Sequence, residues 1–198
     1  GFGSGFGSGF GSGFGDDPFA NISLSTYTNI CFLKGTNIKC FIDNEERDIQ
    51  IENLKEGVLV KTIYNGYIPV KKIYNKHVNL DSTSNIGDRI YKYSKNTKID
   101  LTNDLFLTGY HSILKDELSK SEELNVINTL GKIFITDKKY RLPSMLDKDA
   151  ELYMYKGTCN IWNIYLEHSD EEMNYGIYAN GMLVESCCEK NINKHMLK

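Results

Sequence analysis

The chain has 198 residues, of which 40% are hydrophobic and 25% are charged, and its net charge is −3. This length and hydrophobic content suit one domain of ordinary size with a tail. The slightly acidic balance lacks the basic surface that nucleic acids and anionic membranes attract. No apolar run approaches the about 20 residues of a membrane helix. We therefore expect neither a nucleic acid nor a membrane as a partner.

The cysteines are odd in number and irregular in spacing: Cys31, Cys40, Cys159, Cys187 and Cys188. The absence of a CxxC pair argues against zinc-ribbon and thioredoxin-like sites, so neither a metal nor another cofactor is expected. Adjacent Cys187 and Cys188 do not easily meet the geometry of a disulfide. Free thiols predict an intracellular reducing compartment. A viral particle is the alternative, because the abundance of Asn, Ile, Lys and Tyr is typical of an AT-rich genome.

The first fifteen residues repeat Gly-Phe-Gly-Ser three times and then add Gly-Phe-Gly. Such a segment cannot bury enough varied apolar surface to offset the entropy of ordering it. We expect residues 1–30 to form a disordered tail and linker. Phe at a fixed interval favours weak self-association, whereas the Gly and Ser content is equally typical of a plain flexible linker.

Beyond the tail, the pattern changes to short runs rich in β-branched residues. Ile38–Ile42, Arg47–Ile51 and Val58–Ile63 predict strands. Asn65-Gly66 and Asn180-Gly181 each lie between two such runs. Asn-Gly favours a type I′ turn, in which both central residues have positive φ, so both places predict hairpins.

One helix is predicted near the middle of the chain. Ser119 and Glu122 form a capping box, and Gly131 marks the end of the helix. Leu124 and Ile127 are expected to supply its apolar face.

Further strands are predicted at Ile133–Thr136, Tyr153–Tyr155 and Ile161–Glu167. Residues 81–104 have little periodicity and predict a long surface loop or an irregular hairpin. Many short strands with a single helix indicate an all-β domain.

Three sequence blocks, in this order, resemble those of the Hint (hedgehog/intein) superfamily. They are CFLKGTNI from Cys31 to Ile38, TGYH from Thr108 to His111, and YANGMLVESC from Tyr178 to Cys187. Members of this superfamily cut or splice their own backbone. The resemblance implies a flattened horseshoe of short antiparallel strands over residues 31–187, with residues 188–198 as a C-terminal tail. Within the superfamily, the sequence is most similar to BIL-like domains and those of giant viruses.

The resemblance implies an N-to-S acyl shift at the bond between Ile30 and Cys31. The Cys31 thiol would attack the Ile30 carbonyl, and water or another nucleophile would then resolve the thioester. His111 would donate a proton to the departing Cys31 nitrogen, since an unperturbed His pKa of about 6.5 suits proton transfer near neutrality. Thr108 would hold the scissile peptide. The alternative for a single Cys is a buried structural thiol.

Four further residues are candidates for assisting roles. Asn163 stands where the superfamily often has Asp, and an amide cannot exchange a proton as a carboxylic acid can. Asp104 could act as a base, or be a solvated loop carboxylate. His168 could assist a terminal step, or be an exposed loop histidine. Cys187 could in principle accept the acyl group.

The closing block differs from that of splicing inteins, which end in His-Asn before the final nucleophile. Here Glu185 and Ser186 precede Cys187, and serine has no side-chain amide to cyclise. The sequence therefore predicts cleavage of its own N-terminal segment without splicing. The alternative is a catalytically silent Hint-fold structural or binding module that carries a self-associating tail.

Overall fold

The computed structural model describes residues 30–80, 85–98, 100–154 and 156–190. The predicted tail at residues 1–29 and residues 191–198 lie outside this part of the chain. The helical elements in sequence are η2 (Ile51–Asn53), η4 (Ile86–Asp88), α1 (Lys120–Leu130) and η5 (Ser144–Leu146), where η denotes a 3₁₀ turn. The strands are β1 (Phe32–Leu33), β2 (Asn37–Ile42), β3 (Glu45–Gln50), β4 (Leu59–Lys61), β5 (Tyr67–Asn79), β6 (Ile90–Tyr93), β7 (Leu105–Thr108), β8 (Ser112–Lys115), β9 (Ile135–Thr136), β10 (Lys139–Pro143), β11 (Glu151–Leu152), β12 (Thr158–Leu166), β13 (Gly176–Ala179) and β14 (Met182–Glu185).

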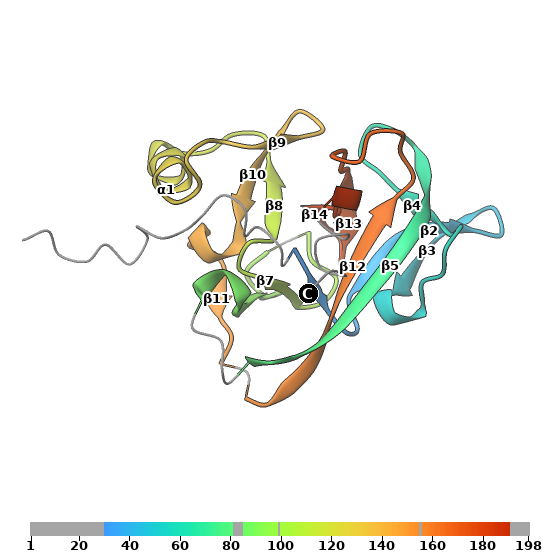
Figure 1. Cartoon of the computed structure of the whole chain (residues 1–198), viewed down its shortest axis with the longest axis horizontal. Coiled ribbons are helices and arrows are strands. Elements are labelled where there is room, and N and C mark those ends of the chain that lie inside the picture. The colour runs from blue at the N-terminus through green and yellow to red at the C-terminus, as the bar shows by residue number, and fades with distance from the viewer. Residues whose placement is uncertain (1–29, 81–84, 99, 155, 191–198) are drawn as a thin grey trace, which may run out of the picture.

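The described strands form one hydrogen-bonded path in the order β11-β6-β7-β1-β12-β5-β4-β2-β13-β14-β8-β10-β9, with β3 added at β2. The long strand β5 joins the two halves of this path, since it pairs with β4 through Tyr67–Pro69 and with β12 through Val70–Asn79. Figure 1 shows the β5–β12 ribbon crossing the molecule. The predicted all-β fold class with one short helix is confirmed for the described residues.

Three hairpins have turns in which both central residues have positive φ: Asp43–Asn44, Asp137–Lys138 and Asn180–Gly181. The Asn180–Gly181 hairpin is therefore confirmed. The hairpin predicted at Asn65–Gly66 is also confirmed, since β4 pairs antiparallel with β5. Its turn is not the predicted type I′, because only Gly66 has positive φ. The connection there is longer, and Thr62 closes it by donating from its backbone and hydroxyl to the Gly66 carbonyl.

The predicted loop at residues 81–104 is wrong in part, because it contains β6. Ile90 and Tyr93 in this strand are buried, and the strand pairs with β7 along its whole length. Of the strand predicted at Tyr153–Tyr155, residue 155 lies outside the described residues. The strand found in this region is β11, which ends at Leu152 and pairs with β6.

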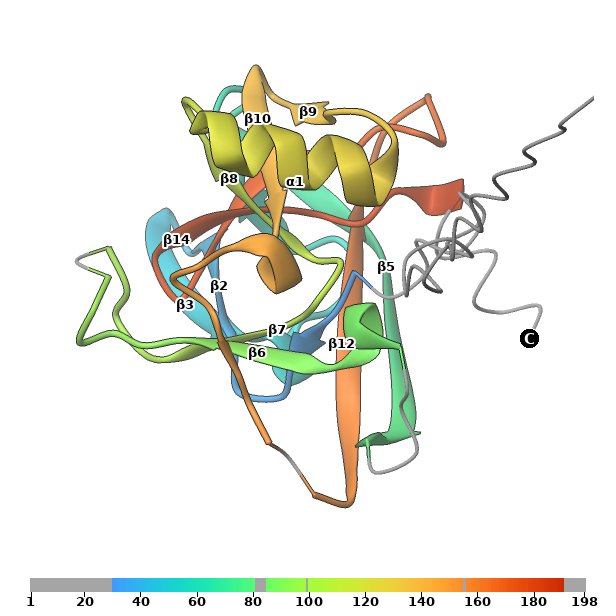
Figure 2. The same ribbon diagram turned by 90° about the vertical axis from the view of Figure 1, so that its left-hand side faces the viewer.

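The predicted ends of the helix are confirmed. The Ser119 hydroxyl accepts from the Glu122 N–H, the Glu122 carboxylate accepts from the Ser119 N–H, and Gly131 ends the helix at φ 77°. Figure 2 shows α1 at one side of the molecule, beside β8, β9 and β10. None of the described helices is long and apolar enough to cross a membrane.

The apolar face predicted for α1 is wrong. Leu124 and Ile127 are exposed, at 59% and 43% of their surface. The buried stripe is Glu122, Val126 and Leu130, which are spaced four residues apart and so lie on one face. Glu122 can lie on this face because Lys115 and the helix N-terminus neutralise its carboxylate.

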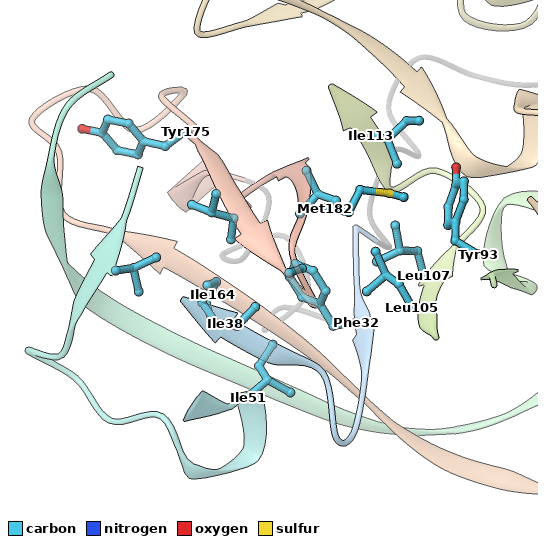
Figure 3. Packing of buried hydrophobic residues seen from close by; sticks show 14 of the residues in the cluster. Phe32, Ile38, Ile51, Tyr93, Leu105, Leu107, Ile113, Ile164, Tyr175 and Met182 are labelled. Atoms are coloured by element: carbon cyan, nitrogen blue, oxygen red, sulfur yellow. The ribbon is translucent and has the colours of Figure 1, made fainter. Parts of the chain in front are cut away.

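The core extends from β2 and β12 to β7 and β8, as Figure 3 shows for Ile38, Phe32, Leu107, Ile113 and Met182. Ile30 and Cys31, which precede β1, and Glu185, which ends β14, are buried beside this core. Several polar side chains are consequently buried beside it, and they make up the site described next.

Candidate functional site

Cys31 lies at the start of β1, between two neighbouring strands. Phe32 pairs with Leu107 on β7 and with Trp162 on β12. In these antiparallel registers, the position before Phe32 lies opposite Thr108 on one side and Asn163 on the other. Ile30 and Cys31 are both buried. The peptide bond predicted to break therefore lies inside the domain, where neighbouring strands fix its surroundings.

Thr108 holds the Cys31 residue at both of its backbone polar groups. Its hydroxyl oxygen accepts from the Cys31 N–H at 2.9 Å, and its own N–H donates to the Cys31 carbonyl at 3.1 Å. The hydroxyl also lies 3.4 Å from that carbonyl oxygen. The scissile nitrogen is thus in contact with a side chain that can accept or donate a proton.

His111 connects the two ends of the described domain. Its Nδ1 lies 3.1 Å from the Cys31 carbonyl oxygen, and its Nε2 lies 2.9 Å from the Glu185 carbonyl oxygen. The ring is fully buried, and the Phe32 ring meets it in a T-shaped contact with centroids 4.3 Å apart. The Cys31 N–H donates to the Thr108 hydroxyl, while His111 contacts the carbonyl of the same residue. Proton donation from His111 to the departing nitrogen stays a prediction.

The two ring nitrogens of His111 both face hydrogen-bond acceptors. A neutral imidazole has only one N–H, so it can satisfy one of the two carbonyls, whereas the imidazolium satisfies both. Burial nevertheless lowers the pKa of His111, and the Glu185 carboxylate and the two carbonyls offset this only in part. His111 is therefore neutral at pH 7, and one of its nitrogens faces an oxygen without a proton between them.

The Cys31 thiol is also held in its uncharged form. Burial raises its pKa well above the ordinary range, the charge of Asp88 adds to this, and Asn163 and Lys76 lower it by smaller amounts. Since the thiolate is the nucleophilic form, burial disfavours the reactive state of Cys31.

Asn163 is the polar neighbour of this thiol. Its side chain is buried, and within the described part of the chain neither its amide oxygen nor its amide nitrogen has a hydrogen-bond partner. An amide N–H directed at a thiolate would gain a charge-assisted hydrogen bond, which accounts for the lowering of the Cys31 pKa. A buried polar group without a partner is rare and often indicates a functional site.

The last block reaches the same region from β14. Ser186 exchanges hydrogen bonds with Tyr175, whose N–H donates to the Ser186 hydroxyl at 2.9 Å. Cys187 donates from its N–H to the Ile164 carbonyl at 3.0 Å, on the strand that carries Asn163. Burial raises the pKa of the Cys187 thiol, and the charges of Cys188, Cys31 and Glu185 add to this.

A buried ionic network surrounds the Glu185 carboxylate. It accepts from the Ser112 N–H at 3.0 Å, from the Asn174 amide at 3.1 Å, and from the Arg141 guanidinium at 2.9 Å. Arg141 also donates to Asn174 and to the Thr136 hydroxyl. Sequence reasoning noted Glu185 only as a departure from the intein pattern. Arg141 and Asn174 were missed, because nothing in their local sequence distinguishes them.

No protein-family model matches the sequence, and no curated protein matches it either. Two solved structures of similar fold are inteins. The first is a DnaB intein from Synechocystis sp. PCC 6803, with a TM-score of 0.41 and 10% identity, covering 79% of this chain and 99% of that chain. The second is a selenomethionine variant of the VidaL intein, with a TM-score of 0.36 and 11% identity, covering 80% of this chain and 94% of that chain. At this level of similarity, neither structure says anything about the side chains around His111.

Two of the predicted assisting residues lie elsewhere. The Asp104 carboxylate pairs with Lys92 at 2.8 Å and accepts from the Lys95 N–H at 2.9 Å, and these contacts lower its pKa. His168 is half-buried in the loop after β12, and its Nδ1 accepts from the Asp170 N–H. Within the described residues, neither side chain is hydrogen-bonded to the site. Over the same residues, no group of three or more His, Cys, Asp and Glu side chains could hold a metal ion.

Proposed function

We propose that the chain is a Hint-type self-processing domain that cleaves its own backbone between Ile30 and Cys31. The Cys31 sulfur attacks the Ile30 carbonyl carbon, and the bond from that carbon to the Cys31 nitrogen breaks. The thiol loses its proton, the nitrogen gains one, and the products are a thioester and a free amine. Water then hydrolyses the thioester, which restores the thiol and releases residues 1–30 with a new carboxylate.

One observation carries this proposal: the buried Cys31 nitrogen is held by the Thr108 hydroxyl, while His111 contacts the carbonyl of the same residue. Leaving as an amine requires that this nitrogen be protonated. Thr108 already contacts it, and His111 Nδ1 lies 3.1 Å from the carbonyl oxygen of the same residue. These two side chains are thus suited to assist protonation of the departing nitrogen, the step on which breakage of the peptide bond depends.

Asn163 is suited to stabilise the attacking Cys31 thiolate. The thiolate that attacks Ile30 is otherwise opposed by burial, and the unpaired Asn163 amide offers it a hydrogen-bond donor. A neutral His111 and a protonated Cys31 both have to change state before reaction. We therefore expect slow cleavage that a small thiol accelerates, because a thiol such as DTT resolves the thioester faster than water does.

Intact-mass spectrometry of the full chain tests the proposal. The parent chain is expected to yield residues 1–30 and residues 31–198, faster with DTT, whereas Cys31→Ala yields only the full-length mass. Cys40→Ala is the matched control, since this thiol is buried in β2 and donates to the Ile38 carbonyl. Cleavage at the same bond in Cys31→Ala, or equal loss of cleavage in Cys40→Ala, would overturn the mechanism.

A catalytically silent module is the second candidate, and the resting state of the site favours it. Both the Cys31 thiol and His111 are uncharged at neutral pH, as expected for groups that serve only to pack. A parent chain that stays full-length with DTT over days, while remaining folded, would support this function. The Gly-Phe-Gly-Ser repeat would then be a permanent self-associating tail, which sedimentation of the chain with and without residues 1–15 measures.

A further inference from the structure

We propose that Glu185 is a positioning residue for His111, and that its carboxylate, held by Arg141 and Asn174, makes the buried imidazole able to carry a proton. This role deepens the proposed self-cleavage and rests on it. The carboxylate contacts neither the scissile bond nor the thiol in the described structure. It acts through the histidine and through the backbone around it.

The geometry connects Glu185 to His111 at two points. The Glu185 backbone carbonyl lies 2.9 Å from Nε2 of the ring. Its carboxylate accepts from the N–H of Ser112, the residue directly after His111, at 3.0 Å. One residue therefore fixes both the ring and the backbone that carries it. Displacing Glu185 would move the ring away from the Cys31 carbonyl, since both contacts belong to the same rigid strand end.

The charges around His111 explain why a carboxylate suits this place. The described groups that contact the ring are the Cys31 and Glu185 backbone carbonyls and the Phe32 ring. The Glu185 carboxylate is the charge that raises the pKa of His111, and Arg141 pairs with that carboxylate. Glu185 is thus the source of negative charge that can balance an imidazolium there. The Glu185 side chain is 1% exposed and that of Arg141 is 21% exposed, so solvent screens this pair little on the glutamate side.

Arg141 compensates the charge of this carboxylate, since the two groups form an ion pair at 2.9 Å. A buried charge without a partner carries a large desolvation penalty. Asn174 adds a second donor, and the Thr136 hydroxyl, Arg141 and Asn174 bond one another. The network is therefore fully partnered, in contrast to the unpaired Asn163 on the other side of the site.

Histidine NMR titration in the non-cleaving Cys31→Ala chain tests the proposal independently of cleavage. The His111 signal is assigned by its loss in His111→Gln. Adding Glu185→Gln is expected to lower the titration midpoint of His111. Glu172→Gln, which removes an exposed carboxylate, is the matched control and should leave the midpoint in place. A merely loosened site would hydrate the ring and raise the midpoint, so the direction separates an electrostatic role from a structural one.

The double variant Glu185→Gln/Arg141→Gln covers the case in which Glu185→Gln alone does not fold. It leaves no unpaired charge, and the midpoint is expected to fall there too, because the carboxylate that raises the pKa of His111 is gone. A midpoint that is unchanged or raised in the folded variant overturns the proposal.

Cleavage kinetics give the second readout. In the chain that retains Cys31, Glu185→Gln should slow cleavage at neutral pH by at least about tenfold. The loss should not exceed the about 10²–10⁴-fold that general acid–base help supplies, since Glu185 acts only through His111. Lowering the pH should restore more of the rate in this variant than in the parent. If the parent does not cleave at all, the proposed function fails while the NMR outcome still decides the role of Glu185. Equal rates in a cleaving parent and variant would contradict the inference.

Discussion

Burial shifts the pKa values of the Cys31 thiol and the His111 imidazole in opposite directions. It raises the pKa of the Cys31 thiol and lowers the pKa of His111, so both are uncharged near neutral pH. A reaction that needs a thiolate and an imidazolium together must draw on a minor state of the protein. Slow, single-turnover chemistry is tolerable in a chain that acts once, whereas an enzyme with many substrates would lose most of its rate.

The lowered pKa of His111 predicts how stability depends on pH. Because the folded-state pKa lies below the unfolded value of about 6.5, the unfolded chain binds more protons in the window between them. The contribution of His111 to the free energy of unfolding is complete above about pH 6.5, and it is lost as the pH falls from there through the folded-state pKa. In the Cys31→Ala background, Tm is expected to fall between about pH 7 and pH 5, and to fall less in His111→Gln.

His168→Gln is the control for this measurement, since it replaces a half-buried loop histidine and retains His111. It should keep the parent's pH dependence. If His111→Gln loses as much Tm on acidification as the parent does, another group is responsible.

The unpaired amide of Asn163 predicts an opposition between stability and activity. Asn163→Leu removes a buried polar group without a partner, and is expected to raise the free energy of unfolding by about 1–3 kcal/mol. It also removes the donor to the thiolate. A hydrogen bond to a charged group is worth about 1.5–3 kcal/mol, so cleavage should slow by about tenfold or more.

Asn160→Leu on the same strand is the matched control, because its side chain is exposed and bonds His77 instead. Chemical denaturation and cleavage time courses of both variants measure the two effects. A destabilised Asn163→Leu chain that cleaves at the parental rate would show that the amide is structural.

At the scale of the elements, the β13–β14 hairpin carries Glu185 and Cys187 to the site. Its turn residue Asn180 exchanges hydrogen bonds with Asn37 on β2 and donates to the Asp104 carbonyl before β7. One turn thus ties together segments from three parts of the chain. A hairpin fixed at its turn presents its last residues in a constant position.

Two glycines allow this turn to be tested with a matched pair. Gly181→Ala combines positive φ with overlap between the new Cβ and the Asp100 carbonyl oxygen, whereas Gly131→Ala at the end of α1 has positive φ and open space. The left-handed conformation alone costs about 1–2 kcal/mol. We expect Gly131→Ala to lose about that much and to cleave normally, and Gly181→Ala to lose more and to cleave slowly. Urea unfolding and mass spectrometry compare them; similar losses in both would mean that the turn is not constrained.

The elements that could be predicted from sequence are those with local signals. The capping box of Ser119 and Glu122, the end at Gly131 and the Asn180–Gly181 turn all depend on neighbouring residues. The strand β6 could not be predicted, because its pairing with β7 rather than its own pattern makes it a strand. The buried face of α1 could not be predicted either, because the helix packs on β10 and η5, which lie outside its own sequence.

The same division applies to the site. Cys31, Thr108 and His111 were found from short blocks, and the structure brings them together. Arg141 and Asn174 could not be found, because an ionic network across distant elements has no signature in the sequence of either element.

At the scale of the molecule, the absence of an amide at Ser186 predicts that residues after Cys187 stay attached. Release of the C-terminal side needs a side-chain amide that attacks its own peptide carbonyl, and the Ser186 hydroxyl bonds Tyr175 instead. With a second domain joined after Lys198, intact-mass spectrometry should detect N-terminal cleavage only. A species in which residues 1–30 are ligated to Cys187 and the second domain would refute this expectation.

The meeting of both domain ends at His111 also sets an order in time. A ribosome delivers residue 31 before residue 187, roughly eight to thirty seconds apart at about 5–20 residues per second. Until β14 is synthesised, the Glu185 carbonyl that contacts Nε2 of His111 is missing. The site around the bond before Cys31 is therefore incomplete until then. Under the proposed function, a chain that terminates before β14 would keep its Gly-Phe repeat. Release of that repeat would therefore report that translation had passed residue 187.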